Sequence, residues 1–213
     1  MKQPTKILIG IPISDDYRVH MGVMLYAALE KESGICGPPR VVPTDDVSTG
    51  RNILVEETLE GGFTHLYQVD SDTVPKPKTL DRLLGYDKDI VGGVYPIYTP
   101  ETGPRWSASI YEPDRDERYW NPVKYKELPK ELFRAHLMGA GILLIKRKVF
   151  EAMEPPWFER THMKKDLISE DLLFCAKAKK LGFSLWADPT KCSHFKSNVD
   201  LKQMFDSCIE QFG

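Results

Sequence analysis

Long apolar runs, paired cysteines and blocks of like charge are all missing from this 213-residue sequence. No run approaches the ~18 apolar residues of a membrane-spanning helix, so we expect no transmembrane segment. The four cysteines have no C-x-x-C spacing, which excludes zinc-ribbon and thioredoxin-type motifs. The net charge is −2 with both signs interspersed, so nucleic acid is not an expected partner.

A secretory pattern is also lacking, because a short strand-like run over residues 6–11 begins almost at once. Isolated cysteines are typical of proteins in a reducing compartment. These features predict a cytoplasmic protein, and association with the periphery of a membrane stays open.

What is present is a regular alternation of strand-like and helix-like segments over residues 1–95. Such alternation is typical of βαβ units, so we predict an α/β fold with a Rossmann-like, mixed but mostly parallel central sheet flanked by helices. A chain of this length can build one core, which predicts a single domain over residues 1–213. The expected strands cover residues 7–11, 41–42, 64–69, 89–94, 142–145 and 184–187; the expected helices cover 20–32, 50–60, 79–84, 169–181 and the chain from about 200.

Asp70-Ser71-Asp72 follows one of the predicted buried strands. It should therefore lie at the carboxyl end of the sheet, where open α/β folds bind their ligands. In an extended backbone, side chains two residues apart point to the same side, so both carboxylates could meet one hard divalent cation. The alternative is that Asp-Ser-Asp only opens a turn.

Glu170 and Asp171 lie in the first turn of a predicted helix that Ser169 caps. Negative charge is favourable there, which is a sufficient structural explanation. The functional hypothesis is that one of the two carboxylates acts as a general base toward an acceptor hydroxyl.

His194 lies one helix and one strand after Asp171, so the chain could return it to the same end of the sheet. An imidazole beside two carboxylates would favour Mn²⁺, whereas an all-oxygen site suits Mg²⁺ equally well. The alternative for a lone histidine is a position on the surface or in the core.

Two further segments suggest contacts with a phosphate-bearing ligand. Gly50-Arg51-Asn52 begins a predicted helix, where backbone N–H groups and a guanidinium suit a diphosphate. Gly139-Ala140-Gly141 would let the backbone approach a ligand closely, or would simply form a tight bend. Within residues 95–131, Trp106 and Trp120 suit stacking on sugar rings, with packing over the sheet as the alternative.

Taken in order, these segments resemble the GT-A nucleotide-sugar glycosyltransferases, most closely the family 2-like members. The resemblance covers about residues 5–196. The matching pieces are Gly50-Arg51-Asn52, the strand that ends in Asp70-Ser71-Asp72, Gly139-Ala140-Gly141, Glu170-Asp171 and His194.

The resemblance implies a metal-dependent enzyme that moves a sugar from a UDP- or GDP-sugar to a hydroxyl of an unknown glycan, lipid or protein acceptor. Asp72 and His194 would bind Mn²⁺ or Mg²⁺. Asp70 would contact either the ribose of the donor or, through water, the metal. Asp171 would be the catalytic base, with Glu170 beside it. Inversion by a single displacement is expected, and retention stays open.

The same resemblance implies a nucleotide-binding half over residues 1–95 and an acceptor and catalytic half over residues 96–213. The residues it assigns to the donor site are Pro12, Ser14, Asp45, Arg51, Asn52, Asp70, Ser71, Gly139 and Gly141.

The sequence also departs from the family pattern. The Gly-to-Arg spacing is compressed, the Q-x-x-R-W segment of processive members is absent, and Ile13-Ser14-Asp15 replaces the usual aromatic-Asn pair. Two alternatives remain: a non-catalytic module that binds sugar nucleotides or glycans, and a nucleotidyltransferase. The second usually needs a basic Gly-rich loop after the first strand, and residues 11–16 are acidic and lack one.

Overall fold

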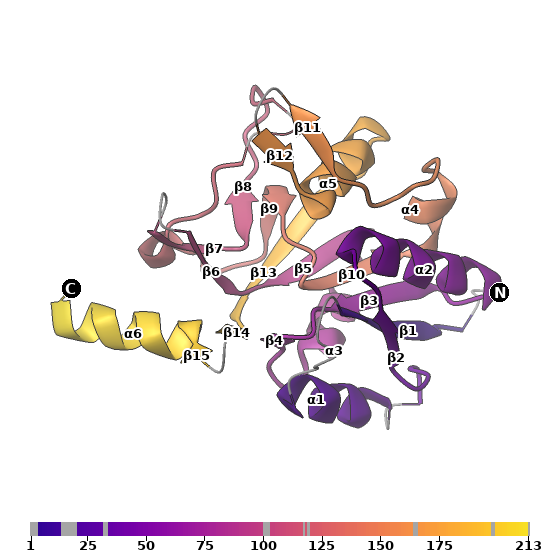
Figure 1. The fold of residues 1–213 in the computed structure, drawn as a ribbon, viewed down its shortest axis with the longest axis horizontal. Helices are drawn as coiled ribbons and strands as arrows, with labels where there is room; N and C mark the ends of the chain where they lie inside the picture. The colour runs from indigo at the N-terminus through magenta and orange to yellow at the C-terminus, as the bar shows by residue number, and fades with distance from the viewer. Residues whose placement is uncertain are drawn as a thin grey trace.

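A mixed eight-stranded sheet forms the centre of the protein (Figure 1). The computed structural model describes residues 4–13, 21–31, 34–99, 103–116, 118, 120–163, 166–196 and 199–212. The strand order is β2-β1-β3-β10-β5-β13-β9-β8. The strands are β1 (Ile7–Ile13), β2 (Arg40–Pro43), β3 (His65–Val69), β5 (Ile90–Val94), β8 (Ala108–Ile110), β9 (Phe133–Met138), β10 (Ile142–Lys146) and β13 (Leu185–Lys191).

Most strands of this sheet run in one direction. β1 is parallel to β2 and β3, and β5 is parallel to β13. β10 is antiparallel to both β3 and β5, and β9 is antiparallel to both β13 and β8. Only β10 and β9 among these eight strands are therefore reversed, which confirms the predicted mixed, mostly parallel sheet.

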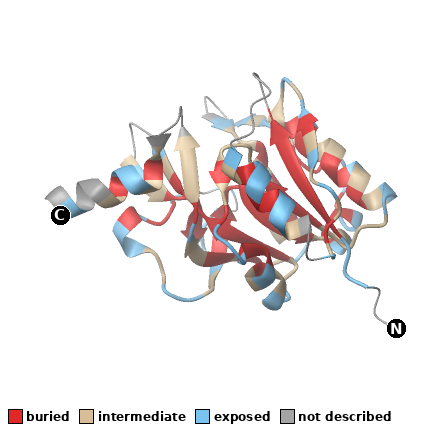
Figure 2. Cartoon of the chain, turned by 90° about the horizontal axis from the view of Figure 1, so that it is seen from below, coloured by how far each residue is buried: buried red, intermediate tan, exposed pale blue. Residues whose placement is uncertain are grey.

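Helices cover both faces of the sheet, and each face has its own apolar core (Figures 1 and 2). α1 (Met21–Lys31) and α3 (Thr79–Gly85) pack on one face, where Val23 and Leu83 are fully buried. α2 (Val47–Glu60), α4 (Arg147–Glu151) and α5 (Glu170–Lys180) pack on the other face. This arrangement matches the continuous apolar runs of the strands, because a strand covered on both faces has no solvent side.

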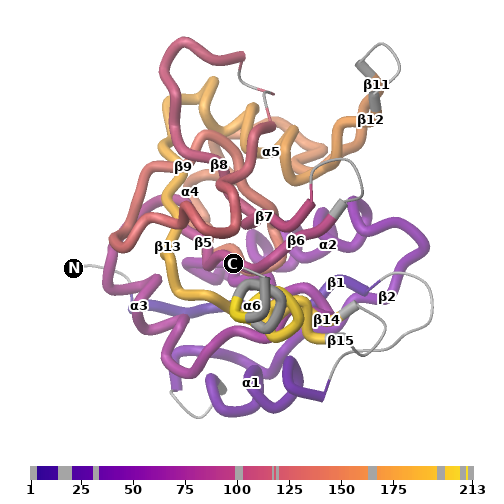
Figure 3. Tube along the Cα trace, turned by 90° about the vertical axis from the view of Figure 1, so that its left-hand side faces the viewer, coloured from indigo at the N-terminus to yellow at the C-terminus, as the bar shows by residue number. Residues whose placement is uncertain are grey.

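Further short strands form three small sheets of their own beside the central sheet. β4 (Thr73–Val74), β14 (Ser193–Lys196) and β15 (Val199–Asp200) form a small sheet. β6 (Pro96–Thr99) pairs with β7 (Gly103–Trp106), and β11 (Thr161–Met163) pairs with β12 (Asp166–Ile168). A short 3-10 turn covers Tyr125–Glu127, and α6 (Leu201–Phe212) carries the chain to its end (Figure 3).

Two predicted boundaries need correction. β1 does not stop at Pro12 but continues to Ile13, because beyond Gly10 it pairs only with β2, and a proline is tolerated where one side of a strand is unpaired. α2 begins at Val47, three residues before Gly50, because the Asp46 carboxylate caps it by accepting from the Thr49 N–H at 3.0 Å.

Tryptophan packing and cysteine state also follow from the structure. Trp106 is fully buried and stacks on Tyr125 with ring centroids 4.6 Å apart, so it packs in the core. Cys36, Cys175 and Cys192 are buried cysteines outside any disulfide. No helix within the described ranges has both the length and the apolar character needed to cross a bilayer.

Candidate active site

The carboxyl end of β3 is where the predicted site residues meet. Asp70 follows β3 directly, and its backbone N–H donates to the Gly141 carbonyl at 2.9 Å. Gly141 can reach this edge because β10 is reversed, so the turn that precedes β10 lies at the carboxyl ends of β3 and β5. The topology therefore brings the Asp70-Ser71-Asp72 and Gly139-Ala140-Gly141 segments together, although Asp72 and Gly139 are 67 positions apart in the sequence.

Arg51 is the buried centre of one part of this site. Its guanidinium is only 3% exposed and donates to the carboxylates of Asp70 at 2.9 Å and Glu170 at 3.3 Å. It also donates to the Gln68 side-chain oxygen at 2.9 Å. Burial alone would lower the pKa of Arg51, but the Asp70 and Glu170 carboxylates outweigh it and raise that pKa, so the guanidinium stays charged.

This placement of Arg51 corrects the prediction made from the helix start. Because α2 begins at Val47, Arg51 lies in the second turn and the Gly50 N–H already donates to the Asp46 carbonyl at 3.2 Å. Neither group is therefore presented to a diphosphate by a helix N-terminus. Arg51 instead ties the carboxyl end of β3 to the start of α5.

Asn52, the next residue, has an equally clear structural role. Its amide donates to the Phe158 carbonyl at 2.7 Å and accepts from the Phe158 N–H at 3.0 Å. The side chain thus replaces a backbone partner for the segment that leads to α5, which explains an asparagine here without any ligand.

The Asp-Ser-Asp segment is not extended, which overturns the predicted convergence of its two carboxylates. The Thr73 N–H donates to the Asp70 carbonyl at 3.1 Å, so residues 70–73 form a turn and the two-residue alternation does not hold. Asp70 therefore points to Arg51, whereas Asp72 points to His194. Burial, followed in the same direction by the charge of Asp72, raises the pKa of Asp70 against the opposing effect of Arg51.

Asp72 and His194 form the second part of the site. His194 Nε2 lies 3.4 Å from Asp72 Oδ2, and the two residues are neighbours because β14 pairs with β4. Burial acts to lower the pKa of His194, but the hydrogen bond and charge of Asp72 outweigh it and raise that pKa. In Asp72, burial is likewise outweighed by His194, so the pKa is lowered.

The donor atoms of this pair suit a divalent cation. His194 Nδ1 lies 2.7 Å from the Pro96 carbonyl, which only accepts, so Nδ1 carries a proton. In the neutral ring, Nε2 then directs a lone pair at the carboxylate, and a proton or a cation between them would remove the repulsion. A second ring nitrogen that donates to a backbone carbonyl is a common arrangement for metal-binding histidines. Asp72 and His194 therefore fit the predicted role.

The net charge of the site also favours binding of a cation. Four carboxylates (Asp70, Asp72, Glu170 and Asp171) gather near two guanidinium groups (Arg51 and Arg160), an excess of two negative charges when these six groups are ionised and His194 is neutral. Among the residues that the structure describes, no three His, Cys, Asp or Glu side chains are grouped as a ready-made metal site. A cation there would thus draw its remaining ligands from water or a bound substrate.

Asp171 and Glu170 have different environments although they are adjacent. Glu170 is buried and accepts from both Arg51 and Arg160, each at 3.3 Å, which gives it a structural role. Asp171 accepts through one oxygen from the Ser169 hydroxyl and from the Leu172 N–H. Burial, together with the charge of Glu170, raises the pKa of Asp171. A carboxylate with a raised pKa is a stronger base.

Tyr95 is a site residue that none of the sequence motifs indicated. It follows β5 at the same edge of the sheet, is buried, and lies between the glycine turn and His194. A β-carbon at Gly139 would lie 2.3 Å from the Tyr95 hydroxyl, and one at Gly141 would lie 2.7 Å from its ring. The two glycines are therefore needed to accommodate Tyr95, and their role in ligand binding stays a prediction. The apolar strand before Tyr95 was the available signal.

The other predicted donor residues are placed as follows. Pro12 is buried near the carboxyl end of β1, beside Gly50. Asp45 is exposed after β2, and Ser71 is half-buried within the turn after β3. Because β1, β2 and β3 are parallel, all three lie toward one edge of the sheet. Ser14 lies outside the described residues.

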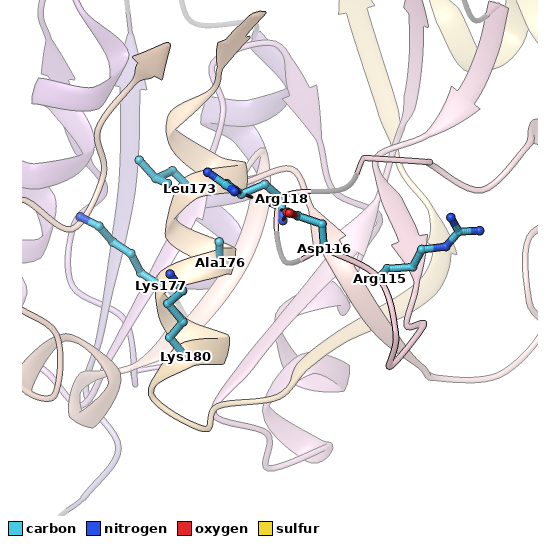
Figure 4. A pocket seen from close by; sticks show the side chains of 7 residues that line it. All are labelled: Arg115, Asp116, Arg118, Leu173, Ala176, Lys177 and Lys180. Carbon is cyan, nitrogen blue, oxygen red and sulfur yellow. Dashed lines mark hydrogen bonds and ion pairs between the residues drawn. The ribbon is translucent and has the colours of Figure 1, made fainter. Parts of the chain in front are cut away.

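A separate cavity of about 440 Å³ lies along the outer side of α5 (Figure 4). It contains none of the predicted site residues. Arg118 reaches over α5 while Arg115 points away from it, and both are paired with nearby acids, as is Lys177. The charges of this cavity are thus largely neutralised by the protein itself. The lining residues are Arg115, Asp116, Arg118, Leu173, Ala176, Lys177 and Lys180.

Comparisons with known proteins support the fold. No protein-family model matches the sequence, and no curated protein matches it. Among solved structures, the protein A197 from STIV aligns with a TM-score of 0.59 and 20% identity, covering 91% of this chain and 87% of its own. A candidate glucose-1-phosphate thymidylyltransferase from Bacillus anthracis, solved with sucrose, aligns with a TM-score of 0.48 and 10% identity over 97% and 96% of the two chains. The likeness to A197 shows a shared α/β, Rossmann-like fold. The TM-score of the second alignment is too low to support an inference.

Proposed function

We propose that this protein is a metal-dependent glycosyltransferase that moves a sugar from a nucleotide-diphosphate sugar to an acceptor hydroxyl. One observation carries the proposal: Asp70, Asp72, Asp171 and His194, from three distant parts of the chain, gather around Tyr95 at the carboxyl end of β3. Ligands of open α/β folds bind at this edge. The excess of carboxylates there favours a substrate that arrives with a cation.

Asp171 is assigned as the general base. The raised pKa of Asp171 suits this role, whereas the Glu170 carboxylate is held by two arginines. Taking the proton from an acceptor hydroxyl would let that oxygen attack the anomeric carbon while the nucleoside diphosphate leaves. A base that acts directly on the acceptor corresponds to a single displacement with inversion.

Asp72 and His194 are assigned to the cation, for which Mn²⁺ suits the mixed oxygen and nitrogen donors. When bound, the cation would neutralise charge that develops on the diphosphate. The protein's own part is to hold the two donors: Pro96 fixes the imidazole through Nδ1, and the Phe195 N–H donates to the Asp72 carbonyl at 2.8 Å.

Arg51 and Glu170 serve this chemistry indirectly in the proposal. Arg51 pairs with Asp70 at the carboxyl end of β3 and with Glu170 in the first turn of α5, so the nearby Asp72 and Asp171 keep a fixed separation. A rigid separation of cation ligands and base is needed because misplacement of about 1 Å can cost roughly 100-fold in rate.

The first test is binding. A thermal-shift screen of UDP-, GDP- and dTDP-sugars is made with and without Mn²⁺, since a ligand that binds only the folded state raises the melting temperature. We expect a shift for one nucleotide sugar that requires Mn²⁺ and is lost in Asp72→Ala. The absence of any metal-dependent shift would contradict the proposal.

The second test is turnover with the donor identified by binding. We expect release of nucleoside diphosphate that falls at least about 100-fold in Asp171→Asn, a typical contribution of a general base, with donor binding kept. Full activity in Asp171→Asn would reject its assignment as the base. Binding without turnover would favour the non-catalytic module, and release of pyrophosphate from a nucleoside triphosphate would favour a nucleotidyltransferase.

A further inference from the structure

Tyr95 has its backbone fixed before its side chain enters the site. The Tyr95 N–H donates to the Ser107 hydroxyl at 3.1 Å, and the Ser107 N–H donates back to the Tyr95 carbonyl at 3.0 Å. Tyr95 is 6% exposed. The ring therefore enters the site from a rigid position at the end of β5.

The hydroxyl end of Tyr95 contacts the glycine turn. The Gly141 N–H donates to the Tyr95 hydroxyl oxygen at 3.1 Å, while the Gly141 carbonyl accepts from the Asp70 N–H at 2.9 Å. One residue of the turn thus links the tyrosine hydroxyl to the residue after β3. A β-carbon built on Gly139 would lie 2.3 Å from this hydroxyl and 3.5 Å from Asp171 Oδ2, which places the base beside the same end of the ring.

The ring of Tyr95 contacts the opposite group of the site. Its centroid lies 5.3 Å from that of His194, with the planes at 73°, an edge-to-face arrangement. Pro96, the residue after Tyr95, accepts from His194 Nδ1 at 2.7 Å. Two consecutive residues therefore fix the position and the protonation of the imidazole.

Acid–base chemistry is not the role of this hydroxyl. Burial, with the nearby charges of Asp70 and Asp171, raises the pKa of Tyr95 well above its ordinary value, so the group stays protonated and neutral at physiological pH. Its contribution is geometric.

We infer that Tyr95 is a positioning residue that sets the distance between the Asp171 base and the Asp72–His194 pair, by holding the glycine turn with its hydroxyl and His194 with its ring. The inference rests on the proposed function for its effect on turnover. The packing on which it depends can be tested without any activity.

The kinetic experiment uses Tyr95→Phe, which keeps the ring and removes only the hydroxyl. We expect kcat to fall about tenfold, as for a small displacement of reacting groups, while the donor KM changes less than about twofold. A tyrosine that only supported the fold would lower the melting temperature without this split. Unchanged kcat in Tyr95→Phe would overturn the inference.

The structural experiment combines this variant with alanine at each glycine. At Gly139 the closest clash is with the hydroxyl at 2.3 Å, and the next contact, with Cζ, is at 3.3 Å. At Gly141 the β-carbon would clash with the hydroxyl at 2.8 Å and also with two ring carbons at 2.7 and 2.8 Å, which phenylalanine keeps. Tyr95→Phe should therefore restore most of the melting temperature lost in Gly139→Ala and little of that lost in Gly141→Ala.

The two arms separate the possible failures. Equal rescue of both glycine variants, or of neither, would show that Tyr95 does not pack as inferred. If the glycine variants behave as expected but the wild-type protein turns over no donor, the proposed function fails while the packing stands, and the inference fails with that function.

Discussion

Asp70 and Asp72 are two residues apart, yet the structure gives their carboxylates opposite environments. The Asp70 side chain is 27% exposed and bonded to a guanidinium that is 3% exposed. The Asp72 side chain is 49% exposed and faces one imidazole at 3.4 Å. Burial raises the pKa of the first, whereas His194 lowers the pKa of the second against the effect of burial.

This difference separates support from function within one motif. Around Arg51, donors and acceptors are largely matched by the protein, so the group acts as a buried scaffold. Asp72 Oδ2 and His194 Nε2 instead face each other with access to solvent, so both atoms can still bind a ligand. We expect changes on the Arg51 side to affect stability most and changes on the Asp72 side to affect it least.

The largest effect is expected from Arg51→Met. It would leave the Asp70 and Glu170 carboxylates near each other without their shared cation, and breaking a buried pair in this way costs about 3–5 kcal/mol. Urea unfolding of Arg51→Met and Arg51→Lys would measure it, with lysine expected between methionine and wild type because it keeps the charge without the fork. A methionine variant as stable as wild type would remove the scaffold interpretation.

A smaller loss is expected from Asn52→Leu, which removes both hydrogen bonds to the Phe158 backbone. Both bonds are only partly buried, so we expect a total loss of about 1–3 kcal/mol, the cost of one unpaired buried group. Asn52→Asp is the matched control, because it still accepts from the Phe158 N–H but cannot donate. Equal free energies of unfolding for the two variants would show that only one of the two bonds matters.

Asp171→Asn should stabilise the protein by less than Asn52→Leu destabilises it. A carboxyl whose folded pKa is raised makes folding less favourable once it ionises, and this cost is absent below its unfolded pKa of about 3.9. The gain in melting temperature over wild type should therefore be near zero at pH 3.5 and grow as the pH rises through the folded pKa to 7. A gain that shrinks with rising pH would contradict the assigned shift.

The smallest change in stability is expected from Asp72→Asn without metal, below about 1 kcal/mol, because exposed ion pairs contribute little. Calorimetry in EDTA would measure this change in stability. After removal of EDTA and addition of Mn²⁺, we expect stabilisation of the wild type only. Stabilisation of both proteins by Mn²⁺ would place the cation elsewhere.

The central sheet could be predicted from the sequence because its strands are continuous apolar runs separated by helix-like segments. The strands at 7–13, 65–69 and 90–94 each match an expected one closely. β9 was missed because Arg134 and His136 interrupt its apolar pattern, and the short strands depend on partners distant in the chain.

The sequence indicated which residues meet at this end of the sheet better than it indicated their geometry. The order of the motifs along the chain correctly predicted that Asp70, Asp171 and His194 lie near one another. It did not predict the turn closed by the Thr73 N–H and the Asp70 carbonyl, which directs Asp72 away from Asp70. Asp46, an ordinary cap, moved the helix start and so changed the role of Arg51. The apolar strand before Tyr95 was its only signal in the sequence, because the two glycines that pack against it lie more than 40 positions away.

The reversed strand β10 places a tightly constrained turn, residues 139–141, directly at the candidate site. β10 begins at the carboxyl ends of β3 and β5 and ends at the opposite side of the sheet, where the Lys146 ammonium donates to the Asp87 carboxylate. Residues inserted before Ile142 would break the contacts that Gly139 and Gly141 make with Tyr95 and Asp70. Residues inserted between Lys146 and α4 would form a loop on the opposite side of the sheet. Relatives that keep this site should therefore vary in length at the second place and not at the first.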